Sequence, residues 1–207
     1  MIEGIYTALV TPFDAEGHVN IEVLDALLTL QIEAGVDGVV ALGTTGEAPT
    51  LLPHEKEQIT RHCAKRCKGK VQLMVGTGAY STLQTIENTK LAKECGADSV
   101  LVVTPFYNRP TQEGLFQHFT AVANGVDIPM VLYNHPGRTG QNIETTTIKK
   151  LAQIPSIVGV KDASGSITQM GDVIATLREQ RPDFSIMSGD DSLLLPLMAL
   201  GGDGVIS

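Results

Sequence analysis

Eight short runs of apolar residues recur along the chain, separated by longer segments that mix apolar and polar positions. A short continuous apolar run bounded by turn residues is typical of a strand buried on both faces, as in a parallel sheet. We therefore expect strands at residues 5–10, 38–42, 71–75, 99–103, 129–133, 157–160, 184–187 and 204–206.

Most segments between these runs carry apolar residues at helical spacing, clearly so at residues 21–34, 54–66, 82–95 and 167–179. Alternating strands and amphipathic helices form βαβ units with right-handed crossovers. Eight such units favour a closed (β/α)8 or TIM barrel over a doubly wound open sheet, which more usually has about five or six strands. The sequence thus predicts an α/β chain in which residues 1–207 form a single barrel domain.

The last expected strand ends next to the final residue, Ser207. A complete barrel has a helix after its eighth strand, so we expect a barrel that lacks this helix. Two interpretations stay open: the sequence is a fragment of a longer chain, or something else covers the last strand. No linker, low-complexity tract or charge block indicates a second domain within these residues.

Composition and charge narrow the classes of function. With 43% hydrophobic and 18% charged residues, the chain has the composition of a soluble globular enzyme. Its net charge of -8 and its pI near 5.0 argue against nucleic acid or an anionic membrane surface as the main partner, because both favour a positive protein face. The sequence shows neither a signal peptide nor an apolar stretch of the roughly 20 residues that a membrane span needs. We expect a cytoplasmic protein that binds small molecules or protein.

Three cysteines give no pattern of disulfides in a chain of this size. His62, Cys63 and Cys67 have the spacing of metal ligands on a helix, but a second ligand pair is missing and the neighbouring basic residues would repel a cation. We predict inert cysteines and no metal site.

Polar residues cluster directly after several expected strands, at residues 43–47, 104–108, 133–138, 161–164 and 189–191. In a (β/α)8 barrel these positions all lie at the C-terminal face, where the active site is built from strand ends and loops. Segments far apart in the sequence are therefore expected to form one site.

Lys161 is the most informative of these residues, because it is a lone cation at the end of the apolar run 157–160. Burial disfavours the ammonium form, so a buried amine is partly neutral near pH 7 and can attack a ketone to form a Schiff base. Two structural explanations compete with this one. Lys161 could mark the exit of the strand into solvent, or it could pair with Asp162, and this segment alone leaves all three open.

Two further segments carry groups that suit carbonyl chemistry. Gly43-Thr44-Thr45-Gly46-Glu47 can present backbone N–H groups and hydroxyls to a carboxylate, although a turn with local threonine hydrogen bonds explains the pattern equally well. Tyr133 brings a phenol that can carry a proton, and Arg138 a guanidinium that can bind a carboxylate. Taken alone, Tyr133 would be a core aromatic residue and Arg138 a surface charge. A Schiff-base lysine one strand away favours instead a site that they share.

The other polar loops are less specific. Tyr107, after the expected strand 99–103, adds a second phenol in a chain with only four tyrosines. For Asp190 and Asp191 we expect a structural role, in which Asp191 or Ser192 caps the next helix.

Three separated motifs, in the same order, resemble those of the dihydrodipicolinate (4-hydroxy-tetrahydrodipicolinate) synthase family of pyruvate-dependent class I aldolases. They are Gly43-Thr44-Thr45-Gly46-Glu47, Tyr133-Asn134-x-Pro136-x-Arg138-Thr139-Gly140 and Gly159-Val160-Lys161-Asp162. The resemblance covers the whole chain. It implies a lyase of the diaminopimelate and lysine pathway that condenses pyruvate with L-aspartate 4-semialdehyde to give 4-hydroxy-tetrahydrodipicolinate.

The resemblance also implies catalytic roles for four residues. Lys161 is implied to form the Schiff base with pyruvate. Thr44, Tyr107 and Tyr133 are implied to form a proton relay, in which Tyr107 reaches the site of a neighbouring subunit across a tight dimer.

Roles in substrate binding are likewise implied by the resemblance. Thr45 corresponds to a ligand of the pyruvate carboxylate, and Arg138 to the residue that receives the carboxylate of L-aspartate 4-semialdehyde. Gly189 and Ile206 correspond to positions that line the site through backbone groups. No chemical role is implied for His135.

The assembly and regulation of the family provide further expectations. The resemblance implies no metal, no nicotinamide cofactor and a homo-oligomer, with a tight dimer and a tetramer in the family. The family continues into a last barrel helix and a small C-terminal helical region, which these residues lack. Free lysine is expected to inhibit weakly or not at all. The positions that correspond to the effector site lack many of the polar side chains with which lysine-sensitive relatives bind the ammonium and carboxylate groups of lysine. These positions are Ala48, Pro53, Lys56, Tyr80, Gln84 and Phe106.

Two alternative functions stay open at this stage. One is a lyase or aldolase of the same superfamily that acts on a sugar acid such as N-acetylneuraminate or 2-keto-3-deoxygluconate, although Thr44, Thr45 and Arg138 favour a short second substrate with a carboxylate. The other is a non-catalytic barrel that binds a keto acid or an assembly partner. The presence of Lys161 and Tyr133 together with Thr44 argues against this second alternative.

Overall fold

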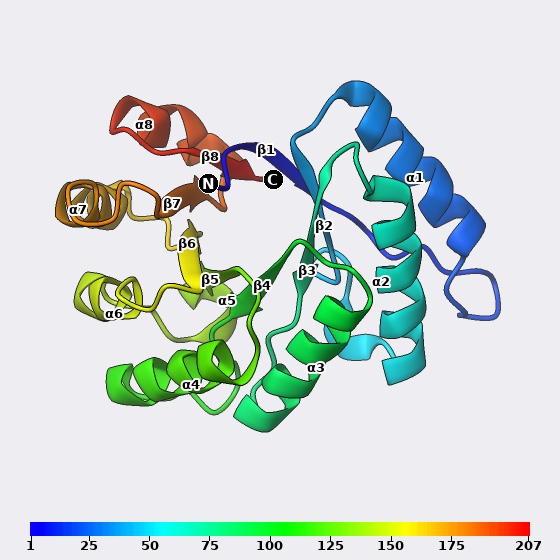
Figure 1. The fold of residues 1–207 in the computed structure, drawn as a ribbon, viewed down its shortest axis with the longest axis horizontal. Helices are drawn as coiled ribbons and strands as arrows, with labels where there is room; N and C mark the ends of the chain where they lie inside the picture. Colours follow the sequence, from blue (N-terminus) through cyan, green and yellow to red (C-terminus); the bar gives the residue numbers. More distant parts are fainter.

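The computed structural model describes residues 1–207, which form a closed barrel of eight parallel strands surrounded by helices (Figure 1). The strands follow one another around the barrel in sequence order, and β8 pairs with β1 to close it. They are β1 (Gly4–Ala8), β2 (Gly38–Ala41), β3 (Gln72–Gly76), β4 (Ser99–Val103), β5 (Met130–Asn134), β6 (Ile157–Asp162), β7 (Ser185–Ser188) and β8 (Gly204–Ile206).

All eight expected strands are confirmed; β4 and β8 have the expected bounds, and the ends of the other strands shift by at most two residues. The largest shift is in β1, which was expected at residues 5–10 but ends at Ala8. Its pairing with β2 stops at Ala8 opposite Val40, so the two following residues lie in the loop. The opposite shift occurs in β6, where pairing with β5 and β7 continues through Lys161 and Asp162. Lys161 is therefore a strand residue.

Seven helices of six or more residues connect successive strands around the outside of the barrel (Figure 1). These are α1 (Ile21–Ala34), α2 (Pro53–Cys67), α3 (Thr82–Glu94), α4 (Gln112–Gly125), α6 (Thr145–Leu151), α7 (Ile167–Leu177) and α8 (Leu194–Ala199). Three single turns complete the set: α5 (Pro136–Thr139) and the 3-10 helices η1 (Ala48–Thr50) and η2 (Asp191–Leu193). No helix follows β8 within the 207 residues, and no helix is both long and apolar enough to cross a membrane.

The starts of the helices follow from local hydrogen bonding. Four helices begin after a short polar residue whose side chain accepts a backbone N–H from the first turn, which satisfies one of the donors left free at a helix N-terminus. These N-caps are Asn20, Ser81, Thr111 and Ser166. Gly35 ends α1 in the left-handed conformation, with φ of 74°.

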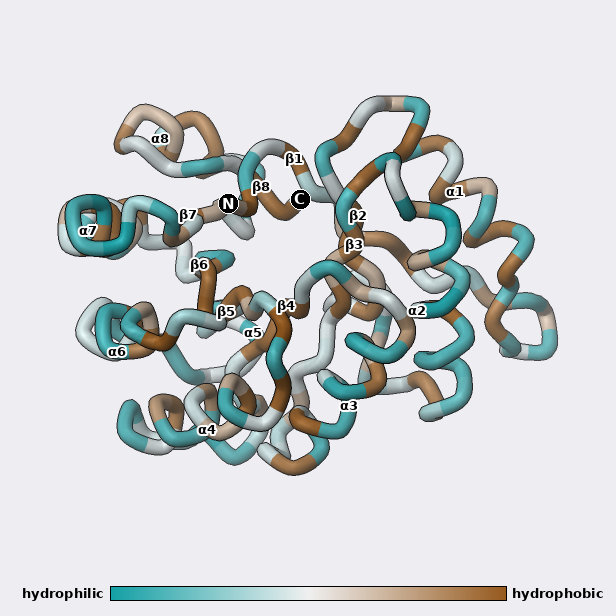
Figure 2. Tube along the Cα trace, in the orientation of Figure 1, coloured by the Kyte–Doolittle hydropathy of each residue, from teal (hydrophilic) through white to brown (hydrophobic).

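Apolar side chains pack in two layers, one inside the barrel and one between the strands and the helices. The strand residues alternate between these layers, because successive side chains of a strand point to opposite faces. In β5, for example, Val131 and Tyr133 lie in the inner cluster, whereas Met130 and Leu132 lie in the outer one. The strands are accordingly mostly hydrophobic, while the helices mix hydrophobic and hydrophilic positions (Figure 2).

The barrel closes where β8 approaches β1 very closely. A Cβ atom at Gly204 would lie 2.0 Å from the backbone oxygen of Gly4, and Gly204 has a φ of 149°. Only glycine fits this position, so the residue type at Gly204 is a condition for closing the sheet.

A repeated carboxylate contact organises the N-terminal face of the barrel. Asp37, Asp98 and Asp203 each stand directly before a strand and accept a backbone N–H from a neighbouring strand. The donors are Ile5, Leu73 and Ile186, at distances of 2.8, 2.8 and 2.7 Å. These contacts link adjacent strand starts around the barrel.

Candidate active site

Lys161 points into the barrel near the C-terminal end of β6. It is 6% exposed, and the strand register places it beside Tyr133 of β5 and Met187 of β7. Asp162 is the next residue on the strand and therefore faces the opposite side. Neither structural explanation of Lys161 holds, because the lysine does not reach open solvent and forms no ion pair with Asp162.

Burial changes the protonation of Lys161. Desolvation lowers the pKa of its ammonium group from 10.5 to about 8; Asp191 opposes the shift, and Arg138 adds to it. With a pKa of about 8, roughly one amine in ten is neutral at pH 7, compared with fewer than one in a thousand at the ordinary pKa. The Nζ atom lies 4.5 Å from the centroid of the Tyr133 ring. A nucleophilic amine is thus held next to a phenol.

A buried hydrogen-bond network fixes the strand that carries Lys161. The carboxylate of Asp162 accepts hydrogen bonds from the Ser164 backbone N–H at 2.8 Å and from the side-chain amides of Asn134 and Gln169, both at 3.2 Å. Asn134 belongs to β5 and Gln169 to α7, so the network joins three elements behind the site. It limits the movement of the backbone at Lys161.

Gly189, directly after β7, borders the lysine side chain, and Ile206 of β8 lies in the inner layer of the barrel. A Cβ atom at Gly189 would lie 2.9 Å from Cε of Lys161, so only glycine leaves room for the lysine side chain at this point. The Gly189 N–H donates to the Asp162 backbone oxygen at 2.7 Å. Ile206 is fully buried in the inner cluster that also contains Tyr133. Gly189 therefore lies beside Lys161, and the implied site roles of both positions stay predictions.

Tyr133 connects Lys161 to an open cavity at the C-terminal face. Burial raises the pKa of its phenol, while the nearby Thr44 hydroxyl and the charge of Arg138 oppose this rise. Thr44, Tyr133, His135 and Arg138 all line one cavity of about 350 Å³. They come from the loop after β2 and from the β5–α5 segment, so the fold brings these predicted groups together.

Of the eight predicted site residues, only Thr44, Tyr133 and Arg138 line this cavity; Lys161, Gly189 and Ile206 do not, and Tyr107 and Thr45 are exposed elsewhere. Tyr107 is 93% exposed, has a φ of 73° and projects from the loop after β4. Thr45 is exposed next to Thr44 but does not line the cavity. The implied roles of both residues stay predictions.

The expected cap after β7 is wrong by one residue. Asp190, rather than Asp191 or Ser192, is the N-cap of η2, and its carboxylate accepts from the Ser192 backbone N–H at 2.9 Å. Asp191 accepts from the Ser207 hydroxyl at 3.0 Å. Its carboxylate also acts on Lys161, an electrostatic role that the capping interpretation missed.

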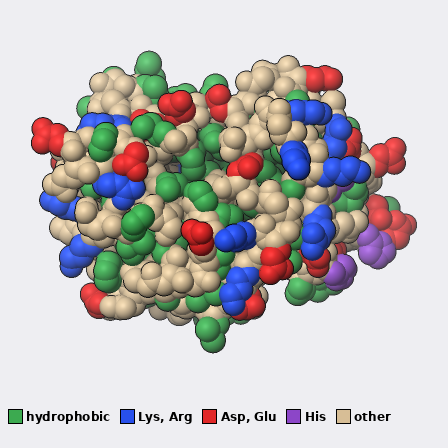
Figure 3. Space-filling view, viewed as in Figure 1, with side chains coloured by type: hydrophobic (Ala, Val, Ile, Leu, Met, Phe, Trp, Pro, Cys, Tyr) green, Lys and Arg blue, Asp and Glu red, His purple; other side chains and the backbone are tan.

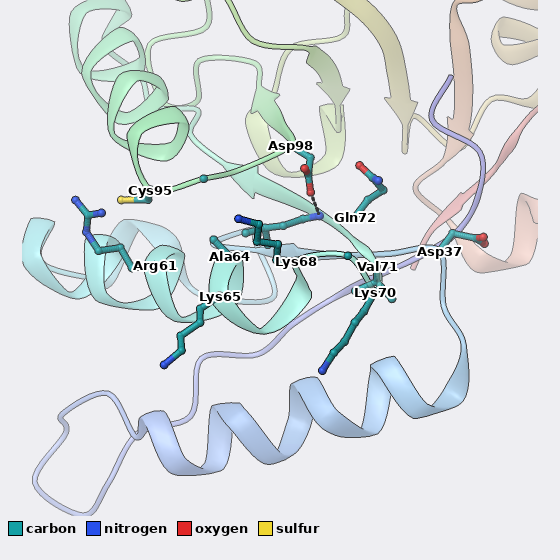
Figure 4. Close-up of a pocket in the computed structure, with 13 residues that line it drawn as sticks. Asp37, Arg61, Ala64, Lys65, Lys68, Lys70, Val71, Gln72, Cys95 and Asp98 are labelled. Atoms are coloured by element: carbon teal, nitrogen blue, oxygen red, sulfur yellow. Dashed lines mark hydrogen bonds between the residues drawn. The ribbon is translucent and has the colours of Figure 1, made fainter.

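The largest cavity, about 810 Å³, lies at the other end of the barrel and holds none of these groups. Its basic residues are Arg61, Lys65, Lys68 and Lys70, at the end of α2 and before β3. The close-up shows that Lys65 and Lys70 extend away from Asp98 (Figure 4). Lys and Arg side chains also gather on the part of the surface where α2 lies (Figure 3). These cations diverge and share no buried polar partner, so this cavity is not the candidate site.

The cysteines lie in apolar surroundings. Burial raises the pKa of the Cys63 and Cys67 thiols to about 12 and about 11, and His62 instead pairs with Asp25 on α1 at 2.9 Å. No group of three or more His, Cys, Asp or Glu side chains is placed to hold a metal ion. His62 therefore joins α2 to α1, whereas Cys63 and Cys67 are buried in the outer core cluster.

Comparison with known proteins gives one consistent family. The sequence model of the Dihydrodipicolinate synthetase family matches residues 1–207. The chain is 52% identical over 206 residues to the 4-hydroxy-tetrahydrodipicolinate synthase of Protochlamydia amoebophila, and the match covers all of this chain and 69% of that protein.

Two solved structures agree with this result. The dihydrodipicolinate synthase of Thermotoga maritima superposes with a TM-score of 0.97 and 41% identity, covering all of this chain and 70% of that one. The chloride-inhibited dihydrodipicolinate synthase of Acinetobacter baumannii, a complex with pyruvate, gives a TM-score of 0.96 and 44% identity with the same coverage. The barrel and its site therefore have close counterparts over the full length of this chain.

Proposed function

The chain belongs to the dihydrodipicolinate synthetase family, and from this premise we propose how its residues carry out the reaction. Its function is that of a 4-hydroxy-tetrahydrodipicolinate synthase, a lyase of diaminopimelate and lysine biosynthesis that uses pyruvate. The names of its relatives favour this function over a sugar-acid lyase or a non-catalytic barrel. The observation that carries the residue assignment is the buried Lys161 amine beside the Tyr133 phenol.

Lys161 starts the reaction as the nucleophile. Its neutral amine attacks the ketone carbon of pyruvate, and loss of water gives an imine between Nζ and that carbon. The protonated imine withdraws electrons from the methyl group, which loses a proton to give an enamine. The lowered pKa of Lys161 supports this role, because a partly neutral amine is available near neutral pH.

Tyr133 and Thr44 move the protons that these steps release and require. The phenol lies within reach of Lys161, and the Thr44 hydroxyl lies near the phenol and lines the same cavity. Proton transfer by positioned groups contributes about 10²- to 10⁴-fold to the rate of such steps. In this proposal Tyr107 completes the relay in a neighbouring subunit.

The second substrate enters through the 350 Å³ cavity. Arg138 lies on its rim and binds the carboxylate of L-aspartate 4-semialdehyde, while Thr45 binds the carboxylate of pyruvate. The enamine carbon then attacks the aldehyde carbon, whose oxygen takes up a proton. The amino group of the second substrate finally attacks the imine carbon, which closes the ring and releases Lys161.

The working unit in this proposal is at least a dimer. Tyr107 is almost fully exposed and held in a left-handed backbone conformation, which suits a side chain that serves a site on another subunit. Mixing a Tyr107→Phe chain with a Lys161→Ala chain should restore part of the activity through subunit exchange. If exchange is demonstrated and activity stays absent, the shared relay is wrong. The tetramer and the cytoplasmic location stay predictions.

Turnover of the two substrates tests the assignment directly. Wild-type protein supplied with pyruvate and L-aspartate 4-semialdehyde should form the cyclic product, and deuterated water should exchange the methyl protons of pyruvate even without the aldehyde. Tyr133→Phe should lose most of this exchange yet still form the imine. Equal exchange in Tyr133→Phe and wild type would remove the phenol from the relay.

A further inference from the structure

His135 occupies the point where β5 ends and α5 begins, between the proposed proton carrier Tyr133 and the proposed carboxylate ligand Arg138. The Nε atom of Arg138 donates a hydrogen bond to Nε2 of His135 at 3.2 Å. The imidazole and the Tyr133 ring meet edge to face, with centroids 5.9 Å apart. His135 thus contacts both residues and lines the cavity that they share.

We propose that neutral His135 is a positioning residue for Arg138, and that it thereby sets how well the second substrate is bound. This inference rests on the proposed function, because it assigns the substrate carboxylate to Arg138. Acceptance of the Nε–H at Nε2 requires that the imidazole be neutral and carry its proton on Nδ1. The His135 backbone oxygen also accepts the Arg138 backbone N–H at 3.0 Å, so backbone and side chain are held by the same residue.

The contact matters because of how a guanidinium binds a carboxylate. Arg138 is largely exposed on a single-turn helix, and a long exposed side chain loses rotamer freedom when it binds a ligand. The hydrogen bond from Arg138 Nε to His135 fixes part of the arginine side chain before the substrate binds. It leaves the two terminal nitrogens free, and these can donate two parallel hydrogen bonds to one carboxylate. Positioning before binding increases affinity without adding a contact to the substrate.

The surroundings of His135 keep it neutral near pH 7. Desolvation lowers the pKa of its imidazole below the usual 6.5, the positive charges of Arg138 and Lys161 lower it further, and Asp190 opposes the shift. The Nδ1 atom is buried without a hydrogen-bond partner and carries its proton in both the neutral and the doubly protonated ring, so the second proton would have to go to Nε2, which accepts from Arg138. Besides Arg138, the ionisable side chains that line the cavity with His135 are Tyr133 and Glu47. Protonation would remove the acceptor at Nε2 and place a like charge against Arg138.

Two variants separate positioning from packing. His135→Leu removes the acceptor, and kcat/KM for L-aspartate 4-semialdehyde should fall about five- to tenfold, within the usual range for one hydrogen bond at an exposed position. Capture of pyruvate as a borohydride-reduced adduct should stay at the wild-type level, which also shows that the variant folds. His135→Gln can place an amide oxygen near the position of Nε2 and should recover most of the loss.

The pH profile supplies a readout that a packing role would not change. In the second half of the reaction Lys161 is already bound to pyruvate, so its titration does not shape kcat/KM for the aldehyde. On the acid side of the usual imidazole pKa of 6.5, kcat/KM of the wild type for the aldehyde should fall as His135 gains a proton. In His135→Gln, kcat/KM should fall only to the extent that the substrate itself is protonated. An identical acid limb in both proteins would overturn the proposal.

A double variant completes the test. If His135 acts through Arg138, His135→Leu should reduce kcat/KM by less than twofold when added to Arg138→Ala. A full five- to tenfold further loss would overturn the positioning role while leaving the proposed function intact. Absence of a pyruvate adduct in wild type would instead overturn the proposed function itself.

Discussion

The two ends of the barrel differ in whether their polar and charged side chains have partners. At the N-terminal face, Asp37, Asp98 and Asp203 each accept a backbone N–H from a neighbouring strand. At the C-terminal face, Lys161 is buried without an ion pair, and His135 keeps a buried nitrogen without a partner. Satisfied polar groups stabilise a fold, whereas buried groups without partners destabilise it and are available for chemistry. This difference separates the face that holds the barrel together from the face that we propose carries out the reaction.

The contrast is sharpest at Lys161, and the first prediction concerns its replacement. Lys161→Ala and Lys161→Arg should both abolish imine formation and turnover, because alanine has no amine and a guanidinium stays protonated. Initial rates with both substrates would measure the loss. Thermal melting at or above the wild-type temperature would show that the variants are folded. Turnover by Lys161→Arg above the background of Lys161→Ala would contradict the nucleophile assignment.

Substitution of Arg138 at the C-terminal face should reduce activity less, and mainly toward the second substrate. Arg138→Ala should lower kcat/KM for L-aspartate 4-semialdehyde roughly 10- to 100-fold, the range expected for loss of hydrogen bonds from a charged group that is partly exposed. Imine formation with pyruvate should change little. Arg138→Lys should fall between the two, because it keeps the charge and loses the paired geometry. Equal losses in both half-reactions would indicate that Arg138 only shapes the loop.

A substitution at the N-terminal face should change the stability of the protein but not imine formation. Asp203→Ala removes the acceptor of the buried Ile186 N–H and the partner of Arg178, and should lower the free energy of unfolding by about 1–3 kcal/mol. Denaturant titration would measure this change. Asp203→Asn is the matched variant and should restore part of it, because an amide oxygen can still accept the N–H. A large loss of imine formation in folded Asp203→Ala would mean that the two faces are not separable.

Replacing Lys161 by an apolar residue should instead raise the free energy of unfolding. Because the folded state lowers the pKa of Lys161 from 10.5 to about 8, the unfolded chain binds more protons between these pH values, and stability rises with pH across this window. Below pH 8 the buried amine is destabilising by at most about 3 kcal/mol. Lys161→Met should therefore stabilise the protein by roughly 1–3 kcal/mol at pH 7, and the gain should shrink above pH 8. Urea titrations at several pH values would check this, and a destabilised variant would contradict it.

The smallest effect is expected for free lysine. Ala48, Pro53, Lys56, Tyr80, Gln84 and Phe106 line one cavity of about 310 Å³, as expected if they form a shared pocket. Lys56 adds a like charge for an ammonium effector, and Gln84 provides no anionic partner, so the pocket should bind lysine poorly. Initial rates should change little up to the millimolar range. Half-inhibition below about 1 mM, a binding free energy of roughly -4 kcal/mol, would show that the pocket is functional.

The fold could be predicted from the sequence because apolar runs recur eight times and most of the segments between them have helical spacing. The strand ends were less accurate, since they depend on where pairing with a neighbour stops, as in β1 at Ala8. Sequence order also could not decide whether Lys161 pairs with Asp162. The structure decides it, because alternation along β6 places Lys161 inside the barrel and Asp162 among Asn134, Ser164 and Gln169.

The candidate site was predicted less completely than the fold. That Lys161, Tyr133 and Thr44 lie near one another could be predicted because all three stand at or just after strand ends, and their catalytic roles stay predictions. His135 was missed, although it lies between two predicted residues, because its role depends on a ring orientation that only the structure provides. The electrostatic action of Asp191 on Lys161 was missed for a similar reason, since the two residues are 30 positions apart and belong to different elements, η2 and β6.

Borohydride trapping with pyruvate tests the central assignment most directly. Pyruvate and borohydride together should inactivate the protein irreversibly, and peptide mass mapping should locate the reduced adduct on Lys161 alone. The rate of trapping should rise with pH toward about 8, as the amine loses its proton. An adduct on another lysine, or undiminished trapping in Lys161→Ala, would contradict the account.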